Sequence, residues 1–172
     1  MEPYTFRPAQ ASDLPRVWEL VQQAKALMDR EGRQQWDESY PLPAHLEEDL
    51  RHRYAYVLSD RASVIAYAAV VFDGEPAYRR IHGRWLSDGP FVVVHRLAVA
   101  EDCQGHGVAT RLMREVEKLS VSQGIFCFRV DTHLENTRMR RVLEKCGFIY
   151  CGEVFYPRGS RMAYEKRLNS RP

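Results

Sequence analysis

Residues 94–109 read VHRLAVAEDCQGHGVA, an apolar run followed by a glycine-containing loop and the start of a helical pattern. The apolar run predicts a strand, and the pattern after it predicts a helix that begins near Val108. Glycines allow the backbone to approach an anion closely, and the first N–H groups of a helix point toward such an anion. The helix macrodipole adds roughly half a positive charge at that end. The segment therefore predicts a phosphate-binding loop at residues 104–109.

Two common phosphate-binding motifs do not fit this loop. No Gly-Lys-Ser or Gly-Lys-Thr follows the glycines, as a P-loop requires, and Ala109 occupies the position of the third glycine of a dinucleotide-binding fingerprint. The loop instead has the pattern Gln-x-x-Gly-x-Ala, formed by Gln104, Gly107 and Ala109. The alternative interpretation is a turn that only connects a strand to a helix.

A second motif lies at residues 136–148. Asn136 follows a predicted strand there, and a short helical segment ends in Gly147-Phe148. In this order and at this separation, the two motifs resemble those of the GNAT N-acetyltransferase superfamily. The resemblance extends over nearly the whole chain and includes a branch known chiefly as uncharacterised bacterial proteins. It identifies residues 104–109 as the counterpart of the family's pyrophosphate loop.

The length of 172 residues suits a single domain over residues 1–172. The resemblance implies an α/β fold, with a mixed and mostly antiparallel sheet that is splayed at its middle strands and has helices on both faces. Residues 73–90 are expected to form a long polar connection. Hydrophobic periodicity predicts strands at residues 4–7, 54–58, 63–72, 91–99, 125–132, 148–155 and 161–168, and helices near Ser12, around Leu46, from Val108 and after Asn136.

The composition is that of an ordinary globular protein. Hydrophobic residues make up 45% of the chain and charged residues 28%, and there are 25 lysines and arginines against 23 aspartates and glutamates. This near balance gives no argument for binding nucleic acid or a membrane, and no apolar run is long enough to span a bilayer. The four cysteines form neither a Cys-x-x-Cys pair nor a zinc spacing with histidines, so no metal is expected. No secretory signal pattern is found, which favours a cytoplasmic location.

The resemblance implies transfer of an acetyl group from acetyl-CoA to a primary amine by direct attack in a ternary complex. The acceptor would be a small molecule, an amino acid or a peptide. In the family, the pyrophosphate lies on the loop and the pantetheine arm pairs with the end of the central strand, where a bulge splays the middle strands. The cofactor-binding residues implied in this way are Leu97, Ala98, Val99, Gln104, Gly105, His106, Gly107, Val108, Ala109 and Asn136.

The catalytic groups are less directly indicated. Many family members carry a tyrosine as general acid in the helix of the second motif, but Leu143 occupies that position here. Tyr150 and Tyr156 are close in sequence and are candidates to replace it. Histidine is the usual side chain for a proton relay near neutral pH, and strand alternation predicts that His95 shares a face with Leu97. The alternatives are a hydrogen-bonded core histidine and ordinary sheet or core tyrosines.

Asp131 and His133 are the second candidate pair for proton transfer. They lie two residues apart at the end of the strand after the phosphate-loop helix and are expected to share a face. The carboxylate of Asp131 would then orient the imidazole or hold a cationic amine. The alternative is that Asp131 only caps the strand end.

Aromatic residues in two loops are the candidates for the acceptor site. Trp36, Tyr78 and Trp85 would flank its entrance and offer a wall for a cation or a flat group, or else serve as packing anchors. Leu143 supports a second hypothesis, a non-catalytic acyl-CoA-binding or regulatory module on the same fold. A homodimer is common in the family, although no sequence feature here selects it.

Overall fold

The apolar run before the loop forms the strand β5 (Val92–Val99), as the sequence predicts. The computed structural model describes residues 3–169. Contacts divide the chain into two units that are interleaved in sequence. The first contains the residues up to Val70 together with His95–Leu112, and the second contains Val71–Val94 and the residues from Met113 onward. The chain therefore crosses from one unit to the other within β5.

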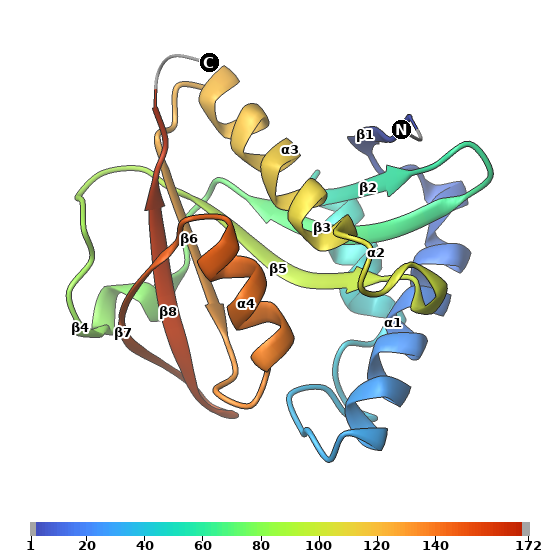
Figure 1. Cartoon of the computed structure of the whole chain (residues 1–172), viewed down its shortest axis with the longest axis horizontal. Helices are drawn as coiled ribbons and strands as arrows, with labels where there is room; N and C mark the ends of the chain where they lie inside the picture. Colours follow the sequence, from blue (N-terminus) through green and yellow to red (C-terminus); the bar gives the residue numbers. More distant parts are fainter. Residues whose placement is uncertain (1–2, 170–172) are drawn as a thin grey trace. The chain divides into compact units, whose positions relative to one another are not determined.

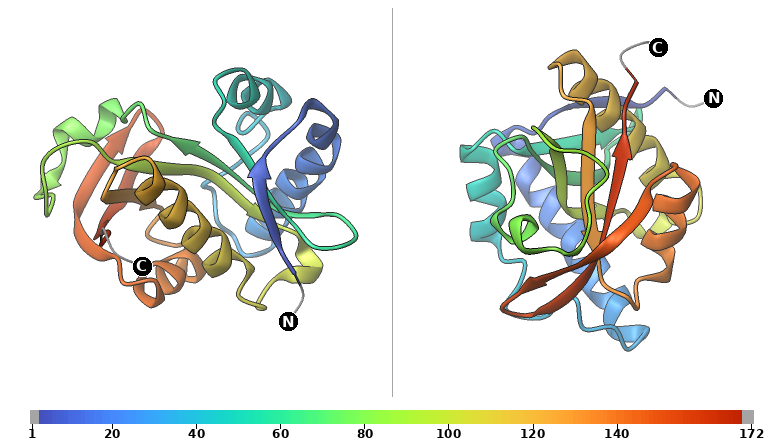
Figure 2. Two further views of the ribbon diagram at one scale, coloured as in Figure 1. Left: turned by 90° about the horizontal axis from the view of Figure 1, so that it is seen from above. Right: turned by 90° about the vertical axis from the view of Figure 1, so that its left-hand side faces the viewer.

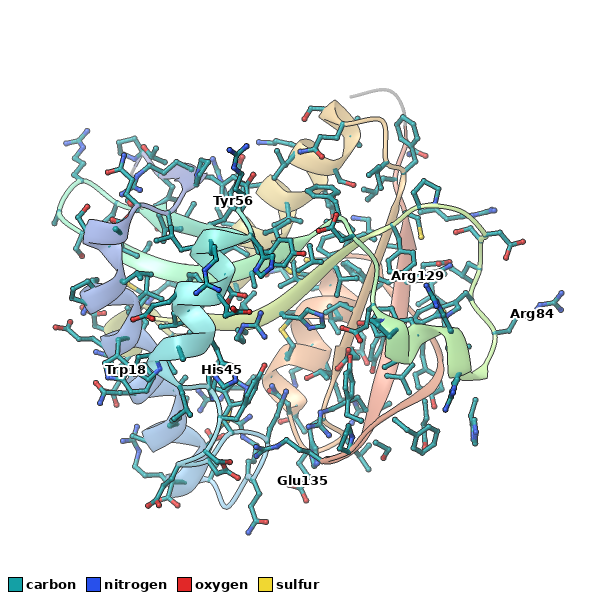
Figure 3. The ribbon with its side chains drawn as sticks, turned by 180° about the vertical axis from the view of Figure 1, so that it is seen from behind. Trp18, His45, Tyr56, Arg84, Arg129 and Glu135 are labelled. Atoms are coloured by element: carbon teal, nitrogen blue, oxygen red, sulfur yellow. The ribbon has the colours of Figure 1, made fainter. Side chains whose placement is uncertain are left out.

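The first unit combines antiparallel strands with two helices. β1 (Thr5–Pro8) pairs with β2 (Ala55–Ser59), which pairs with β3 (Val64–Val71). α1 (Leu14–Arg30) and α2 (Pro43–Arg51) lie on one face of these strands, toward the viewer in Figure 3. β1 runs beside the strand pair in Figure 2. The 3-10 helices η1 (Ala11–Asp13) and η3 (Glu101–Cys103) complete this unit.

The second unit holds the parallel strand pair and the C-terminal hairpin. β6 (Cys127–Thr132) pairs in parallel with β5 at Val92 and Val93, and β8 (Gly159–Arg167) is antiparallel to β6. β7 (Ile149–Tyr156) forms a long hairpin with β8, which is red in Figure 2. α4 (Thr137–Lys145) lies in front of β6 and β8 in Figure 1, and α3 (Val108–Ser122) leads into this unit.

Because β5 contributes to both units, the strands form one mixed sheet in the order β1-β2-β3-β5-β6-β8-β7-β4. The α/β fold with a mixed sheet and flanking helices is therefore confirmed. The prediction of a single domain over residues 1–172 stays a prediction. In the part of the chain that the structure describes, no helix has the length and apolar character to cross a bilayer.

The connection at residues 73–90 is more ordered than the sequence indicates. It contains the 3-10 helix η2 (Pro76–Arg80) and the short strand β4 (His82–Gly83), which pairs with β7. Gly83 and Gly152 lie opposite each other, and a Cβ on Gly152 would stand 2.2 Å from the carbonyl oxygen of His82. Only glycine permits this approach of two backbones. The pairing joins segments far apart in sequence, so local patterns do not reveal it.

The four cysteines are free, and burial raises the pKa of each thiol, to about 11 for Cys127. A raised thiol pKa stabilises the fold below the unfolded pKa near 9, and this contribution is lost as the pH rises through about 11. We therefore expect the difference in free energy of unfolding between the wild type and Cys127→Ala to shrink between these pH values. Urea titrations at several pH values measure it, and a difference that does not change with pH would contradict the prediction.

Candidate functional site

The predicted phosphate loop has the local geometry that an anion requires. Gly105 and Gly107 have φ values of 77° and 76°, in the left-handed region that favours glycine. Nothing lies within 4 Å of the position that a Cβ would take on either residue. The side chain of Gln104 fastens the loop to its strand, because its Nε2 donates to the carbonyl of Val99 at 3.1 Å. The loop thus presents open backbone beside the end of β5.

The helix α3 begins directly after the second glycine. The backbone N–H of Arg111 donates to the carbonyl of Gly107 at 2.9 Å, which makes Gly107 the last residue before the helix. The N–H groups of the first turn have no acceptor within the helix. Val108 and Thr110 are buried and hold this turn in place, whereas His106 is exposed. Open glycine backbone and a helix N-terminus together fit a pyrophosphate group.

The strand β5 changes direction at Arg96, which has a φ of 53°. An extended strand requires a negative φ, so side-chain alternation does not continue through this residue. Alternation therefore no longer supports the expectation that His95 and Leu97 share a face, which stays a prediction. His95 and Leu97 are both partly buried, and Ala98 and Val99 are buried.

A buried polar network surrounds the Arg96 side chain, and the sequence did not indicate it. Nε of Arg96 donates to Oδ2 of Asp49 at 2.7 Å, and Nη2 donates to the other carboxylate oxygen. Nη1 donates to the hydroxyl of Tyr40 at 2.9 Å, and the hydroxyl of Tyr67 donates to Asp49 at 2.6 Å. Burial and the charge of Asp49 raise the pKa of Tyr67 far above its usual range. All four side chains belong to the first unit.

In the second unit, Asp131 is the centre of another polar cluster. Its Oδ2 accepts hydrogen bonds from the hydroxyls of Tyr78 and Tyr156, each at 2.7 Å. Burial first, and then the Asp131 charge, raise the pKa of both phenols well above the usual value. Trp85 joins this cluster, since its Nε1 donates to the carbonyl of Tyr78 at 2.9 Å and the two ring centroids are 5.0 Å apart. The structure thus brings four predicted residues together, Asp131, Tyr78, Tyr156 and Trp85.

His133 does not share the environment of Asp131 that the sequence led us to expect. β6 ends at Thr132, so His133 lies beyond the strand and outside its alternation. Its Nδ1 accepts from the backbone N–H of Glu135 at 3.3 Å. Figure 3 labels Glu135 in this turn. The carboxylate of Asp131 is oriented through its Oδ2 by the two tyrosines, and the pairing of Asp131 with the His133 imidazole stays a prediction.

The remaining candidates differ in accessibility. The side chain of Asn136 caps α4 by accepting from the N–H of Met139 at 3.1 Å, and Leu143 is fully buried in that helix. Tyr150 is about half exposed and meets Tyr164 edge to face. Trp36, in the first unit, is buried.

Arg129 packs against Trp85, and the sequence did not indicate this contact either. Its guanidinium lies 4.4 Å from the ring centroid of Trp85 and 4.3 Å from that of Phe91, and Figure 3 labels it on β6. Nε of Arg129 donates to Oε1 of Glu165 at 2.7 Å. Glu165 is fully buried, and its Oε2 has no hydrogen-bond partner among residues 3–169. Within the same range, no group of three or more His, Cys, Asp or Glu side chains could hold a metal ion.

The predicted site residues divide between the two units. The loop residues 104–109, the strand residues 97–99, His95 and Trp36 belong to the first unit. The others, Asp131, His133, Asn136, Tyr150, Tyr78 and Trp85, belong to the second. The structure therefore describes a phosphate loop in the first unit and a tyrosine–carboxylate cluster in the second, each with its own geometry.

Comparison with known proteins places this geometry in a family. Residues 17–148 match the sequence model of the acetyltransferase (GNAT) family. A GNAT-family acetyltransferase from Streptococcus agalactiae 2603 is 30% identical, with a TM-score of 0.89 and 96% of each chain covered. A putative acetyltransferase from Staphylococcus aureus Mu50 is 29% identical, with a TM-score of 0.73, covering 96% of this chain and 99% of that one.

A more distant structure shares the fold alone. An aminoglycoside acetyltransferase solved in complex with coenzyme A is 20% identical, has a TM-score of 0.71, and covers 96% of this chain and 95% of its own. No curated protein matches the chain in sequence. The family match spans most of the chain and includes the loop, β5 and α4. The chain therefore belongs to the GNAT family of acetyltransferases, whose members are generally enzymes that use acetyl-CoA.

Proposed function

We propose that this protein transfers the acetyl group of acetyl-CoA to a primary amine in a ternary complex. The observation that carries the proposal is the loop at residues 104–109, with two left-handed glycines leading into α3. Such a loop binds pyrophosphate through backbone N–H groups. Coenzyme A bound to the aminoglycoside acetyltransferase of the same fold supports the choice of cofactor. A cytoplasmic location and a homodimer remain predictions from the sequence.

Different segments of the chain would bind the cofactor and stabilise the charge that develops during the reaction. The backbone of residues 104–109 would hold the pyrophosphate, the backbone of Leu97–Val99 would pair with the pantetheine arm, and a strand N–H would stabilise the thioester oxygen as charge develops. Asn136 is the proposed further cofactor contact. Acetyl-CoA supplies the activated acetyl group.

The acceptor amine must lose a proton before it attacks, because a primary amine with a pKa near ~10 is mostly protonated at neutral pH. His95 and His133 are the proposed proton acceptors, since an imidazole titrates near neutral pH. Both are partly buried rather than enclosed, which leaves each imidazole accessible. His95→Ala and His133→Ala, compared over a range of pH, distinguish them, because loss of the base removes the acidic limb of the rate profile.

Asp131 is the proposed group that receives the acceptor as an ammonium ion. It is partly exposed, and its Oδ2 is fixed by two hydroxyl donors, which orient the carboxylate. We expect Asp131→Asn to raise the KM for the amine by roughly tenfold or more, because a charge-assisted hydrogen bond is replaced by a neutral one. The KM for acetyl-CoA should be unchanged.

Steady-state kinetics with each substrate varied in turn measures this split. Tyr156→Phe is the matched control, because it removes one donor to Asp131 and leaves the carboxylate in place. If Asp131→Asn lowers the melting temperature and leaves the KM for the amine at the wild-type value, then Asp131 only supports the packing of Tyr78 and Tyr156.

Leu143 favours a second candidate function, a non-catalytic acyl-CoA-binding module. It is fully buried where many relatives carry a tyrosine acid, and the hydroxyls of Tyr78 and Tyr156 are both engaged with Asp131. Tyr150 is the remaining tyrosine candidate, since it is about half exposed. A thiol with a pKa near ~8.5 is already a fair leaving group. Acetyl transfer therefore does not require a general acid to protonate the leaving thiolate.

The test begins with isothermal titration of acetyl-CoA into the full chain. Binding in the micromolar range supports the cofactor loop, and no binding by the folded protein overturns the acetyltransferase proposal. A panel of amines, amino acids and peptides is then assayed for release of the coenzyme A thiol. Amine-dependent release supports the enzyme, whereas tight binding with no release across the panel supports the binding module.

A further inference from the structure

Arg96 adopts a backbone conformation that is unusual within a strand. Among residues 3–169, two non-glycine residues have a positive φ, Arg53 at 61° and Arg96 at 53°. Arg53 lies in the exposed turn after α2, where a left-handed residue commonly ends a helix. Arg96 is flanked on both sides by residues of β5. A left-handed side-chain-bearing residue is strained there, and such strain persists only where the surroundings impose it.

The surroundings of Arg96 come from three other segments of the first unit. Asp49 from α2 receives two hydrogen bonds from the guanidinium, and Tyr40 from the α1–α2 connection receives a third. Tyr67 from β3 donates to the same carboxylate. Asp49 is 2% exposed and Tyr67 is fully buried, so water has little access to the carboxylate. A two-point contact between guanidinium and carboxylate fixes orientation as well as distance.

The residues that follow Arg96 are the ones expected to pair with the cofactor. The φ of Arg96 determines where the backbone N–H and carbonyl groups of Leu97, Ala98 and Val99 point. We propose that Arg96 and Asp49 are positioning residues, whose buried ion pair holds the left-handed turn of β5 and so sets the direction of these backbone groups toward acetyl-CoA. This inference rests on the proposed function, because it assigns the pair a purpose in cofactor binding.

The first test compares two equivalent substitutions in the same unit. Asp13 also forms a two-point contact with an arginine, at 2.7 and 3.0 Å from Arg7, and it lies outside the candidate site. Asp49→Asn and Asp13→Asn are both expected to lower the melting temperature. Only Asp49→Asn is expected to raise the KM for acetyl-CoA, by roughly tenfold, because misplacement of binding groups is costly. Equal KM values in the two variants would overturn the proposal.

The second test separates the backbone from the side chain. Arg96→Gly and Arg96→Ala both remove the guanidinium and leave Asp49 without that partner, but only glycine adopts a positive φ at no steric cost. We expect Arg96→Gly to bind acetyl-CoA more tightly than Arg96→Ala in isothermal titration. Equal affinities would mean that the ion pair stabilises the unit without setting the turn.

A third measurement does not depend on the reaction. Amide hydrogen exchange of the free protein should be faster at Leu97–Val99 in Asp49→Asn than in Asp13→Asn, after correction for global stability. Failure of the wild type to bind acetyl-CoA would overturn the proposed function. Unchanged exchange at Leu97–Val99 would overturn the positioning role, whatever the reaction is.

Discussion

Gly107→Asp is expected to weaken acetyl-CoA binding by about a hundredfold or more, which corresponds to about 3 kcal/mol or more, chiefly from like-charge repulsion. Gly107 has a φ of 76° and open space where a Cβ would stand. A carboxylate there lies beside the helix N-terminus, in the position proposed for the pyrophosphate. It would offer negative charge to the same N–H donors and repel the phosphates. Isothermal titration of acetyl-CoA into wild type and variant measures the loss.

Two controls separate charge from strain. Gly124→Asp introduces the same side chain at a φ of 73°, also with open space, in the turn after α3 and outside the loop. It should lose a similar stability of roughly 1–2 kcal/mol and keep its affinity for acetyl-CoA. Gly107→Ala adds the strain without the charge and should fall between wild type and Gly107→Asp. If Gly107→Asp binds as tightly as Gly124→Asp, the loop is only a connection and does not hold the pyrophosphate.

The parts of the fold that local patterns encode were predicted well. β5 was expected at residues 91–99 and is found at Val92–Val99, and α3 begins at Val108 as expected. Hydrophobic periodicity similarly predicts a helix near Ser12, and α1 begins at Leu14. The glycines of the loop indicate left-handed backbone, because glycine adopts a positive φ without steric cost. These features depend on residues that are close in sequence, so one chain is enough to recognise them.

The polar networks could not be predicted, because their partners are distant in sequence. Arg96 and Asp49 are charged residues that a sequence assigns to the surface, yet 47 positions separate two groups that meet in a buried ion pair. Tyr78 reaches Asp131 across 53 positions. The alternation rule applied to His95 fails for the same reason, since the tertiary contacts of Arg96 impose a φ that the strand pattern does not contain.

The roles of Asp131 and His133 depend on where the strand β6 ends. Residue type and position along a strand suggested Asp131 and His133 as a pair, but the pair requires both residues to lie within β6. The strand ends at Thr132, one residue before His133, and Asp131 accepts hydrogen bonds from Tyr78 and Tyr156. Element ends depend on hydrogen bonds to neighbouring strands, which the sequence of one strand does not specify.

Glu165→Ala is expected to lower the free energy of unfolding by about 3–5 kcal/mol, because it leaves the buried charge of Arg129 without its partner. The side chains of Arg129 and Glu165 are 7% and 0% exposed, so solvent cannot replace the lost interaction. Cys127 also loses an acceptor, since its Sγ donates to Oε1 of Glu165 at 3.0 Å. Urea-induced unfolding, followed by tryptophan fluorescence and circular dichroism, measures the change.

The double variant Arg129→Met/Glu165→Leu decides whether the pair itself stabilises the fold. A buried ion pair loses hydration on both partners, so apolar residues of similar volume often match its stability. Methionine can keep the packing between the rings of Trp85 and Phe91, which the guanidinium now occupies. We therefore expect the double variant to be more stable than Glu165→Ala. If it is as unstable as the single variant, the apolar residues do not replace the pair, and the ion pair is then a net source of stability.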